Sequence, residues 1–121
     1  MVKALFDTNV LIDYLSGIKA AKTELAKHSD KAISLITWME IQVGTEPSDQ
    51  VRVDKFLLKF EVLPITMEVS AEAVAIRKRA RIRLPDAIIW ATARLEERIL
   101  VTRNKKDFPA SDPGIRIPYA T

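Results

Sequence analysis

Val2-Lys3-Ala4-Leu5-Phe6 runs directly into Asp7-Thr8-Asn9 near the start of the chain. The first five residues are nearly continuously apolar, which is typical of a short strand buried on both faces of a parallel sheet. The next three are of types that begin helices, and apolar residues then recur at helical spacing as far as Leu15. The stretch therefore predicts a strand followed by a helix, the repeating unit of an α/β domain.

The same alternation continues to the end of the chain. Further strands are predicted over residues 32–36, 61–65, 99–102 and 114–118, and further helices over 18–28, 48–60, 68–82 and 86–97. Thr37 is expected to cap one more helix, which carries Trp38 and Val43. We therefore expect an α/β fold with a mainly parallel sheet of four to five strands and right-handed crossovers, in which active sites lie at the carboxyl ends of the strands.

Length and composition predict a single domain over residues 1–121, because 121 residues with 48% hydrophobic content suffice for one core but not for two. No apolar run approaches the ~18 residues of a membrane span, and the N-terminus lacks the pattern of a signal peptide. The chain has no cysteine, which excludes disulfides, thiolate metal sites and thiol nucleophiles. We expect a cytoplasmic protein with no membrane association.

The charges include one concentrated basic run. The formal net charge is +3, from 19 Lys and Arg against 16 Asp and Glu. Five cations fall within seven residues: Arg77, Lys78, Arg79, Arg81 and Arg83. These residues could hold nucleic-acid phosphates or form a solvated helix face. The single histidine, His28, cannot make a histidine-rich metal site, and we expect it to be exposed near a helix end.

Four acidic residues lie near predicted strand ends or in the first turns of the helices that follow: Asp7, Glu40, Asp86 and Asp107. Taken singly, each could be a helix cap, a solvated acid or a turn residue. Glu40 and Asp86, however, sit in very apolar stretches, where an ionised carboxylate is costly unless it is compensated. If the four acids meet at one sheet edge, a hard divalent cation, Mg²⁺ or Mn²⁺, would relieve their repulsion. Such a cluster beside a basic helix suits phosphodiester hydrolysis.

Four segments carry a family resemblance: residues 6–11, 37–40, 84–93 and 101–104. In this order they resemble the motifs of the PIN-domain ribonucleases, and most of all the VapC-like toxins of bacterial toxin–antitoxin pairs. The resemblance extends from Leu5 to Tyr119.

The resemblance implies a Mg²⁺- or Mn²⁺-dependent endoribonuclease on a three-layer α/β/α sandwich. It further implies structured RNA such as tRNA or rRNA as substrate, a homodimer, and a cognate antitoxin whose tail covers the acidic groove. Asp7, Glu40 and Asp86 match the family's acidic positions as catalytic residues and metal ligands. The fourth position falls on Asn104 or Asp107, and we place it on Asp107. The same resemblance implies supporting polar roles for Thr8, Asn9, Thr37, Thr102 and Asn104.

Other protein classes fit less well or remain open. A phosphoacceptor receiver domain would need paired acids after the first strand, whereas Asp7 is followed by Thr8-Asn9. The glycines, at 17, 44 and 114, cannot form a dinucleotide-binding loop. A housekeeping PIN nuclease and a catalytically silent binding module remain alternatives. We expect Trp38 and Trp90 to make core or subunit contacts rather than to stack on bases.

Overall fold

A computed structural model describes residues 3–120, so the start of the first predicted strand, Val2, lies outside the described residues. The chain runs through β1 (Ala4–Phe6), α1 (Thr8–Leu15), α2 (Lys19–Ala26), β2 (Lys31–Ser34), α3 (Leu35–Val43), the short 3-10 helix η1 (Pro47–Asp49), α4 (Gln50–Leu57), β3 (Glu61–Leu63), α5 (Met67–Ala80), α6 (Leu84–Leu95), β4 (Ile99–Val101) and β5 (Ile115–Arg116). Within residues 3–120, no helix combines the length and the apolar character needed to cross a membrane.

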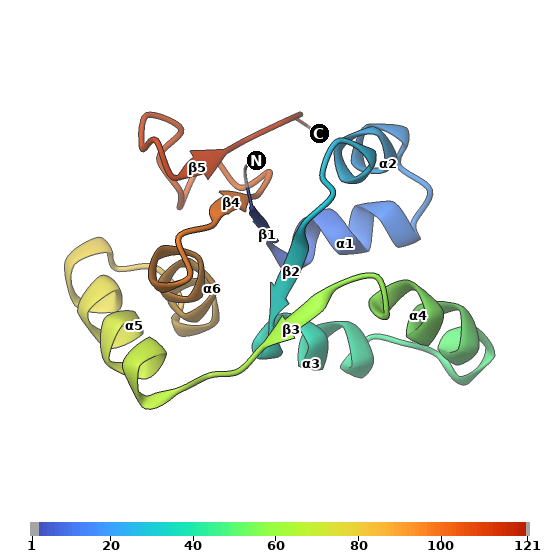
Figure 1. Cartoon of the computed structure of the whole chain (residues 1–121), viewed down its shortest axis with the longest axis horizontal. Coiled ribbons are helices and arrows are strands. Elements are labelled where there is room, and N and C mark those ends of the chain that lie inside the picture. Colours follow the sequence, from blue (N-terminus) through green and yellow to red (C-terminus); the bar gives the residue numbers. More distant parts are fainter. Residues whose placement is uncertain (1–2, 121) are drawn as a thin grey trace.

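The strands form one five-stranded sheet in the order β3-β2-β1-β4-β5, and every described pairing is parallel. The central strand β1 pairs with β2 and β4, so that Leu5 lies opposite Ala32 and Leu100. Helices α1 and α2 lie to one side of the sheet with α4, and α5 and α6 lie to the other (Figure 1). The predicted α/β fold with a parallel sheet is confirmed.

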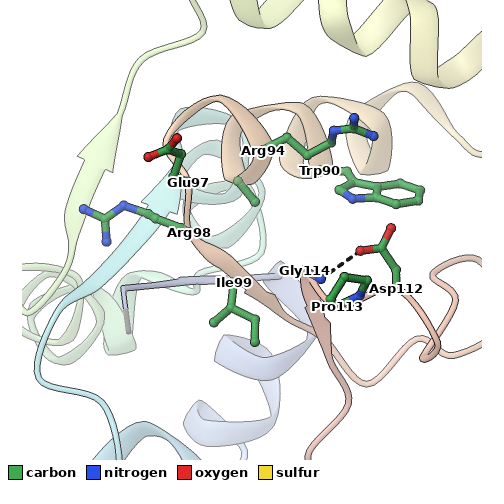
Figure 2. Close-up of a pocket in the computed structure, with 9 residues that line it drawn as sticks. Trp90, Arg94, Glu97, Arg98, Ile99, Asp112, Pro113 and Gly114 are labelled. Atoms are coloured by element: carbon green, nitrogen blue, oxygen red, sulfur yellow. Dashed lines mark hydrogen bonds between the residues drawn. The ribbon is translucent and has the colours of Figure 1, made fainter. Parts of the chain in front are cut away.

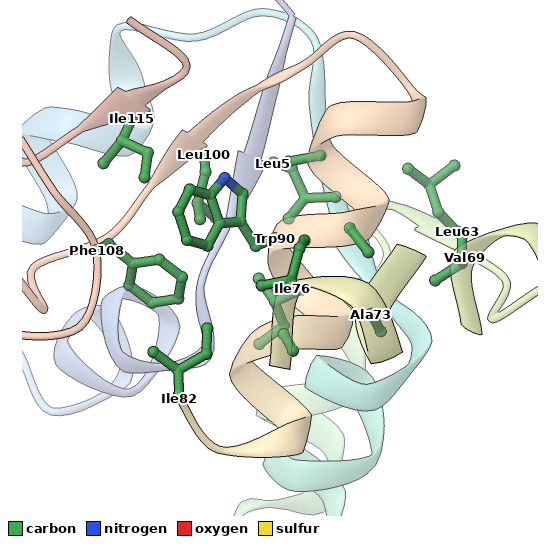
Figure 3. Close-up of a cluster of buried hydrophobic side chains, with 14 of the residues drawn as sticks. Leu5, Leu63, Val69, Ala73, Ile76, Ile82, Trp90, Leu100, Phe108 and Ile115 are labelled. Atoms are coloured by element: carbon green, nitrogen blue, oxygen red, sulfur yellow. The ribbon is translucent and has the colours of Figure 1, made fainter. Parts of the chain in front are cut away.

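Each face of the sheet has its own apolar core, because neighbouring residues of a strand point to opposite faces. Phe6, Ile33 and Val101 pack against α1, α2 and α4. Leu5 and Leu100 pack against α5 and α6 on the other face (Figure 3). Burial on both faces explains why the strands read as continuous apolar runs rather than as alternating ones.

Trp90 belongs to the second core, as expected. It is 9% exposed, and its ring packs edge-on against Phe108 at a centroid distance of 5.4 Å. Trp38 differs: it is 38% exposed on α3, so it is not a core residue.

The junction between β2 and α3 corrects two boundaries. The predicted strand over 32–36 ends at Ser34, and the helix begins at once with Leu35. Ser34, not Thr37, caps α3, since its Oγ accepts the backbone N–H of Ile36 at 3.2 Å. The apolar pair at 35 and 36 fits a strand and a buried helix equally well, so periodicity could not separate them.

His28 is also placed differently from the prediction. Its side chain is only 12% exposed, with Nε2 2.8 Å from Oε2 of Glu24. Its ring packs edge-on against Phe6 at 5.3 Å. The chain turns back toward β2 directly after α2, and this turn folds the imidazole over the sheet.

Candidate active site

Asp7 stands at the carboxyl end of the central strand β1 and caps helix α1. Its side chain is buried, and Oδ1 accepts the backbone N–H of Thr8 at 2.7 Å. The other oxygen, Oδ2, accepts hydrogen bonds from the Thr102 hydroxyl at 2.8 Å and from Asn9 Nδ2 at 3.2 Å. Asp7 is therefore both a helix cap and a carboxylate fixed at the sheet edge, so the two explanations of this residue hold together.

Glu40 is brought to the same edge by α3, which follows β2. The Thr8 hydroxyl donates to Glu40 Oε1 at 2.7 Å, and the hydroxyls of Thr8 and Thr37 are hydrogen bonded at 2.9 Å. Thr37 is completely buried. These hydroxyls join the first turns of α1 and α3 and fix the position of Glu40 relative to Asp7.

The loop after β4 holds both candidates for the fourth acidic position. Asn104 Nδ2 donates to Asp107 Oδ2 at 3.0 Å, and the backbone N–H of Asp107 donates back to Asn104 Oδ1 at 3.2 Å. The backbone N–H of Asn104 in turn donates to Thr102 Oγ1 at 3.0 Å. The amide of Asn104 thus holds the carboxylate of Asp107 in place, with Thr102 linking both to Asp7.

Asp86 lies in the first turn of α6, behind Pro85. Its side chain is 15% exposed, and Oδ2 is 3.6 Å from Nε of Arg83. The positive end of the helix dipole favours an acid at this position.

Hydrogen bonds through Thr8 and Thr102 link Asp7 to Glu40 and to the loop that holds Asp107, and the charges of the four carboxylates act on the pKa values of Asp7 and Asp86. Burial raises the pKa of Asp7 to about 6; the Thr102 and Thr8 hydrogen bonds oppose this rise, and the charges of Asp86 and Glu40 add to it. Burial also raises the pKa of Asp86, Arg83 opposes the rise, and the charges of Asp107 and Glu40 reinforce it. The structure therefore brings together all four acids that the sequence singled out.

The chemistry of this donor set fits a hard divalent cation. The converging side chains offer carboxylate, hydroxyl and amide oxygens, and His28 is paired with Glu24 instead. Their mutual repulsion is of the kind that such an ion relieves. Among residues 3–120, no three acidic or histidine side chains form a ready-made metal-binding group. Each carboxylate has a hydrogen-bond or ion-pair partner in the protein.

The basic run joins α5 to α6 beside Asp86. Arg77, Lys78 and Arg79 lie in the last turn of α5, Arg81 follows in a left-handed conformation, and Arg83 precedes α6. All five cations are exposed. Of these five, Arg83 is the one with an ion pair to a site carboxylate in the described part of the chain.

Sequence reasoning missed a buried acid next to the site. Asp13 on α1 accepts from Arg103 Nε at 2.7 Å and from the Tyr119 hydroxyl at 2.8 Å. The backbone N–H of Arg103 also donates to Asn9 at 3.5 Å. These contacts tie the loop after β4 to α1. The signal was present, because Asp13 sits among apolar residues in the same way as Glu40 does.

A pocket of about 620 Å³ lies away from this edge, between the end of α6 and the start of β4 (Figure 2). Trp90, Arg94, Arg98 and Asp112 contribute to its wall. Its arginines are already paired: Arg98 with Asp30 and Glu61, and Arg94 with Glu72. None of the four site acids lines this pocket.

Known proteins resemble the chain over nearly its whole length. The PIN domain family matches residues 4–111. Ribonuclease VapC10 of Mycobacterium tuberculosis is 32% identical over 124 residues, which cover 96% of this chain and 92% of the relative.

Solved structures also resemble the chain over nearly its whole length. A chain of a toxin–antitoxin complex from Klebsiella pneumoniae superposes with a TM-score of 0.92 at 45% identity, covering 98% of this chain and all of that one. A chain of a DNA-bound VapBC complex from Salmonella typhimurium superposes with a TM-score of 0.81 at 25% identity, covering 96% of each chain. With its acids gathered where the parallel strands end, and with these likenesses along its length, the chain belongs to the PIN-domain family, among its VapC-like members.

Proposed function

We propose that the protein is a metal-dependent endoribonuclease that hydrolyses RNA phosphodiester bonds at the acidic edge of its sheet. The observation that carries the proposal is the convergence of Asp7, Glu40, Asp86 and Asp107, whose charges influence one another at the carboxyl ends of the strands. The relative named a ribonuclease supports the same activity.

In this proposal the four acids hold Mg²⁺ or Mn²⁺, with Asn104 orienting Asp107 through its amide. When bound, such an ion neutralises charge on the phosphate and activates water for attack. One carboxylate accepts a proton from the attacking water. The polar neighbours Thr8, Asn9, Thr37 and Thr102 keep the carboxylates in place by the hydrogen bonds already described.

The basic run is proposed to hold phosphates that flank the cut. Arg83 lies nearest to the site, because it is paired with Asp86 while 71% of its side chain is exposed. Arg77, Arg79 and Arg81 extend the positive charge away from the edge. Their contacts are with the RNA backbone and therefore do not depend on base sequence.

We further propose a toxin role in the cytoplasm, with tRNA or rRNA as substrate and a cognate antitoxin as inhibitor. Structures similar to this chain come from a toxin–antitoxin complex and from a VapBC complex, which favours this role over housekeeping RNA processing. A homodimer is also proposed: α3 exposes Trp38, Met39 and Val43, apolar residues suited to contact a second copy. Mass measurement by light scattering in solution checks the dimer, and a monomeric mass at micromolar concentration would refute it.

The experiment that tests the proposed function is cleavage of a total-RNA pool by the purified protein with Mn²⁺, with Mg²⁺ and with EDTA. We expect cleavage with either metal and none with EDTA. Asp7→Asn and Asp86→Asn are each expected to lower the cleavage rate by a factor of about 100 or more, because each removes a charge that holds the ion. Asparagine at position 7 can still cap α1, so the fold should survive.

Asp112→Asn is the matched control. Asp112 lies in the pocket near β4 and accepts the backbone N–H of Gly114, a bond that asparagine can keep. This variant should cleave RNA like the wild type. Equal cleavage by the wild type and Asp7→Asn would reject the mechanism, and metal-independent cleavage would reject the role of the ion.

A further inference from the structure

A second cationic surface lies between α1, α2 and α4, apart from the basic run. It consists of two adjoining hollows of about 530 and 290 Å³, which share Tyr14, Lys22, Phe56 and Lys59 in their walls. We call this surface the basic groove and define it by the cations that line it: Lys22, Lys31, Arg52, Lys55 and Lys59. Among the described residues, none that lines either hollow is acidic.

Most of this positive charge is uncompensated. Arg52 has an acidic partner, since its Nη2 lies 3.4 Å from Asp49. Lys31 donates to the carbonyl of His28 at 2.9 Å, which leaves its charge unpaired. Lys22, Lys55 and Lys59 are exposed, and none of them forms a salt bridge within residues 3–120. Like charges gathered in this way favour a polyanionic ligand.

The basic groove is continuous with the acidic edge. A third hollow, of about 360 Å³, is lined by Glu40 and shares Leu15 and Arg52 with the basic groove. Its other acid, Asp49, is paired with Arg52. A ligand strand that contacts Glu40 can therefore continue past Leu15 into the cationic region. Figure 1 shows α1 and α4 side by side on this face of the sheet.

The aromatic floor of the basic groove does not offer a stacking surface for bases. The ring of Tyr14 is stacked on Phe56 with centroids 4.5 Å apart and planes 8° apart. Lys22 Nζ lies over the Tyr14 ring, 5.9 Å from its centroid. These contacts already engage the Tyr14 ring, so the groove offers charge to a backbone rather than a platform to a base.

We propose that the basic groove binds the phosphate backbone of an RNA strand whose neighbouring segment lies at the acidic edge. The proposal rests on the proposed ribonuclease function and adds a tract of the substrate-binding surface to it. RNA is favoured over an acidic protein segment because the groove leads to the proposed cut site. Binding along the groove is expected to be independent of base sequence and steeply dependent on salt.

The test is RNA binding by fluorescence anisotropy, with a labelled single-stranded RNA in EDTA so that no cleavage intervenes. The triple variant Lys22→Gln/Lys55→Gln/Lys59→Gln should flatten the slope of log K against log salt by about 2, because each phosphate that a cation neutralises on a single strand contributes about 0.7 to that slope. At low salt its affinity should fall by about tenfold or more. The matched control is Lys3→Gln/Lys19→Gln/Lys27→Gln, which removes the same charge from exposed positions outside the groove and should keep the wild-type slope.

The outcomes separate the two proposals. A wild type that neither binds nor cuts RNA would overturn both. If the wild type cuts RNA but the groove variant keeps its slope and affinity, the basic groove is not an RNA site and the proposed function stands. If the groove variant binds RNA normally but no longer binds a synthetic polyglutamate peptide that the wild type binds, the occupant is an acidic protein segment and the RNA assignment is wrong. Thermal melts verify that both triple variants are folded.

Discussion

Thr102 connects two parts of the acidic edge through one hydroxyl. It is completely buried, donates to Asp7 and accepts the backbone N–H of Asn104. Asp7 belongs to the end of β1, whereas Asn104 begins the turn that holds Asp107. Thr102 is therefore a positioning residue, which sets the distance between the first and the fourth acid without being one of them.

Replacing this hydroxyl with a methyl group tests the positioning role. Thr102→Val keeps the shape of the side chain but removes the hydrogen bonds of the hydroxyl to Asp7 and Asn104 and a longer one from Asn9 at 3.4 Å. A hydrogen bond is worth about 1–3 kcal/mol when a charged or buried partner is left behind. We expect kcat for RNA cleavage to fall by about 10- to 100-fold with little change in KM. Thr102→Ser should recover most of the activity, because it restores the hydroxyl. A valine variant that is folded and retains the wild-type kcat would contradict the role.

At this scale the sequence predicted the acids better than their surroundings. Asp7, Glu40 and Asp86 could be found from their place after strands or in apolar stretches. The pairing of Asn104 with Asp107 could not, because it depends on a turn that closes two hydrogen bonds between them. The apolar neighbourhood of Asp13 could have pointed to a buried acid, but its partners, Arg103 and Tyr119, could not be predicted because they are about a hundred residues away along the chain.

Helix ends show how local signals succeed or fail at the scale of elements. Helix α1 ends before Gly17, which has a φ of 85° and is of the residue type that favours such a position. The chain leaves α5 and α6 through Arg81 and Glu97 instead, which follow the last helical residues and have φ values of 57° and 53°. Such left-handed positions favour glycine. Because neither residue is a glycine, the residue types did not predict where these two helices end. Packing of the helices against the sheet overrides the local preference there.

Strain at the end of α6 can be relieved by substitution. A non-glycine residue in the left-handed region costs about 1–2 kcal/mol. Glycine removes this cost, but its greater freedom in the unfolded chain offsets about 0.4–1 kcal/mol of the gain. Glu97→Gly is therefore expected to raise the free energy of unfolding by about 0.5–1 kcal/mol, measured by urea denaturation. Glu96→Gly is the matched control: Glu96 has a φ of −89°, so glycine should give no gain there. A destabilised Glu97→Gly variant would show that the left-handed backbone is not strained.

Over the whole molecule, a buried charge cluster joins α2 to the edge strand β5. Glu24 is 2% exposed and accepts from Arg116 Nε at 2.6 Å and from Nη2 at 2.8 Å. The Arg116 guanidinium lowers the pKa of Glu24 to about 2, with His28 adding to the effect and burial opposing it. The cluster fastens the last strand to a helix that lies nearly a hundred residues earlier.

This cluster predicts how stability changes in acid. The pKa of Glu24 is about 2 in the folded protein against a reference value of 4.5, so its contribution is complete above about pH 4.5 and is lost as the pH falls toward 2. At about 1.4 kcal/mol per unit of pKa, the loss amounts to at most ~3 kcal/mol. Glu24→Gln should melt at a lower temperature at neutral pH and lose less stability between about pH 4.5 and 2.5. The exposed control Glu46→Gln should follow the wild-type profile, and an unchanged acid profile in Glu24→Gln would contradict the assignment.

Whole-molecule features differed in how far the sequence predicted them. The parallel α/β fold followed from the alternation of apolar runs with helical periodicity, because burial on both sheet faces leaves that pattern in the chain. The basic groove left no such pattern. Its cations are scattered from Lys22 to Lys59, and the fold alone places α2 beside α4. A surface that is formed by several helices can therefore be recognised only from the folded structure.

Strand β4 pairs with the central strand β1 although the two lie far apart in the sequence. This separation has a consequence for the synthesis of the chain. Asp7 and Glu40 are synthesised well before Thr102 and Asp107, which follow Asp7 by about a hundred residues along the chain. A nascent chain that has not yet reached Asp107 therefore lacks part of the site. Fragments released by stalled ribosomes before residue 99 would lack both strands on that side of β1, and with them Thr102 and Asp107, so we expect such fragments not to cleave RNA.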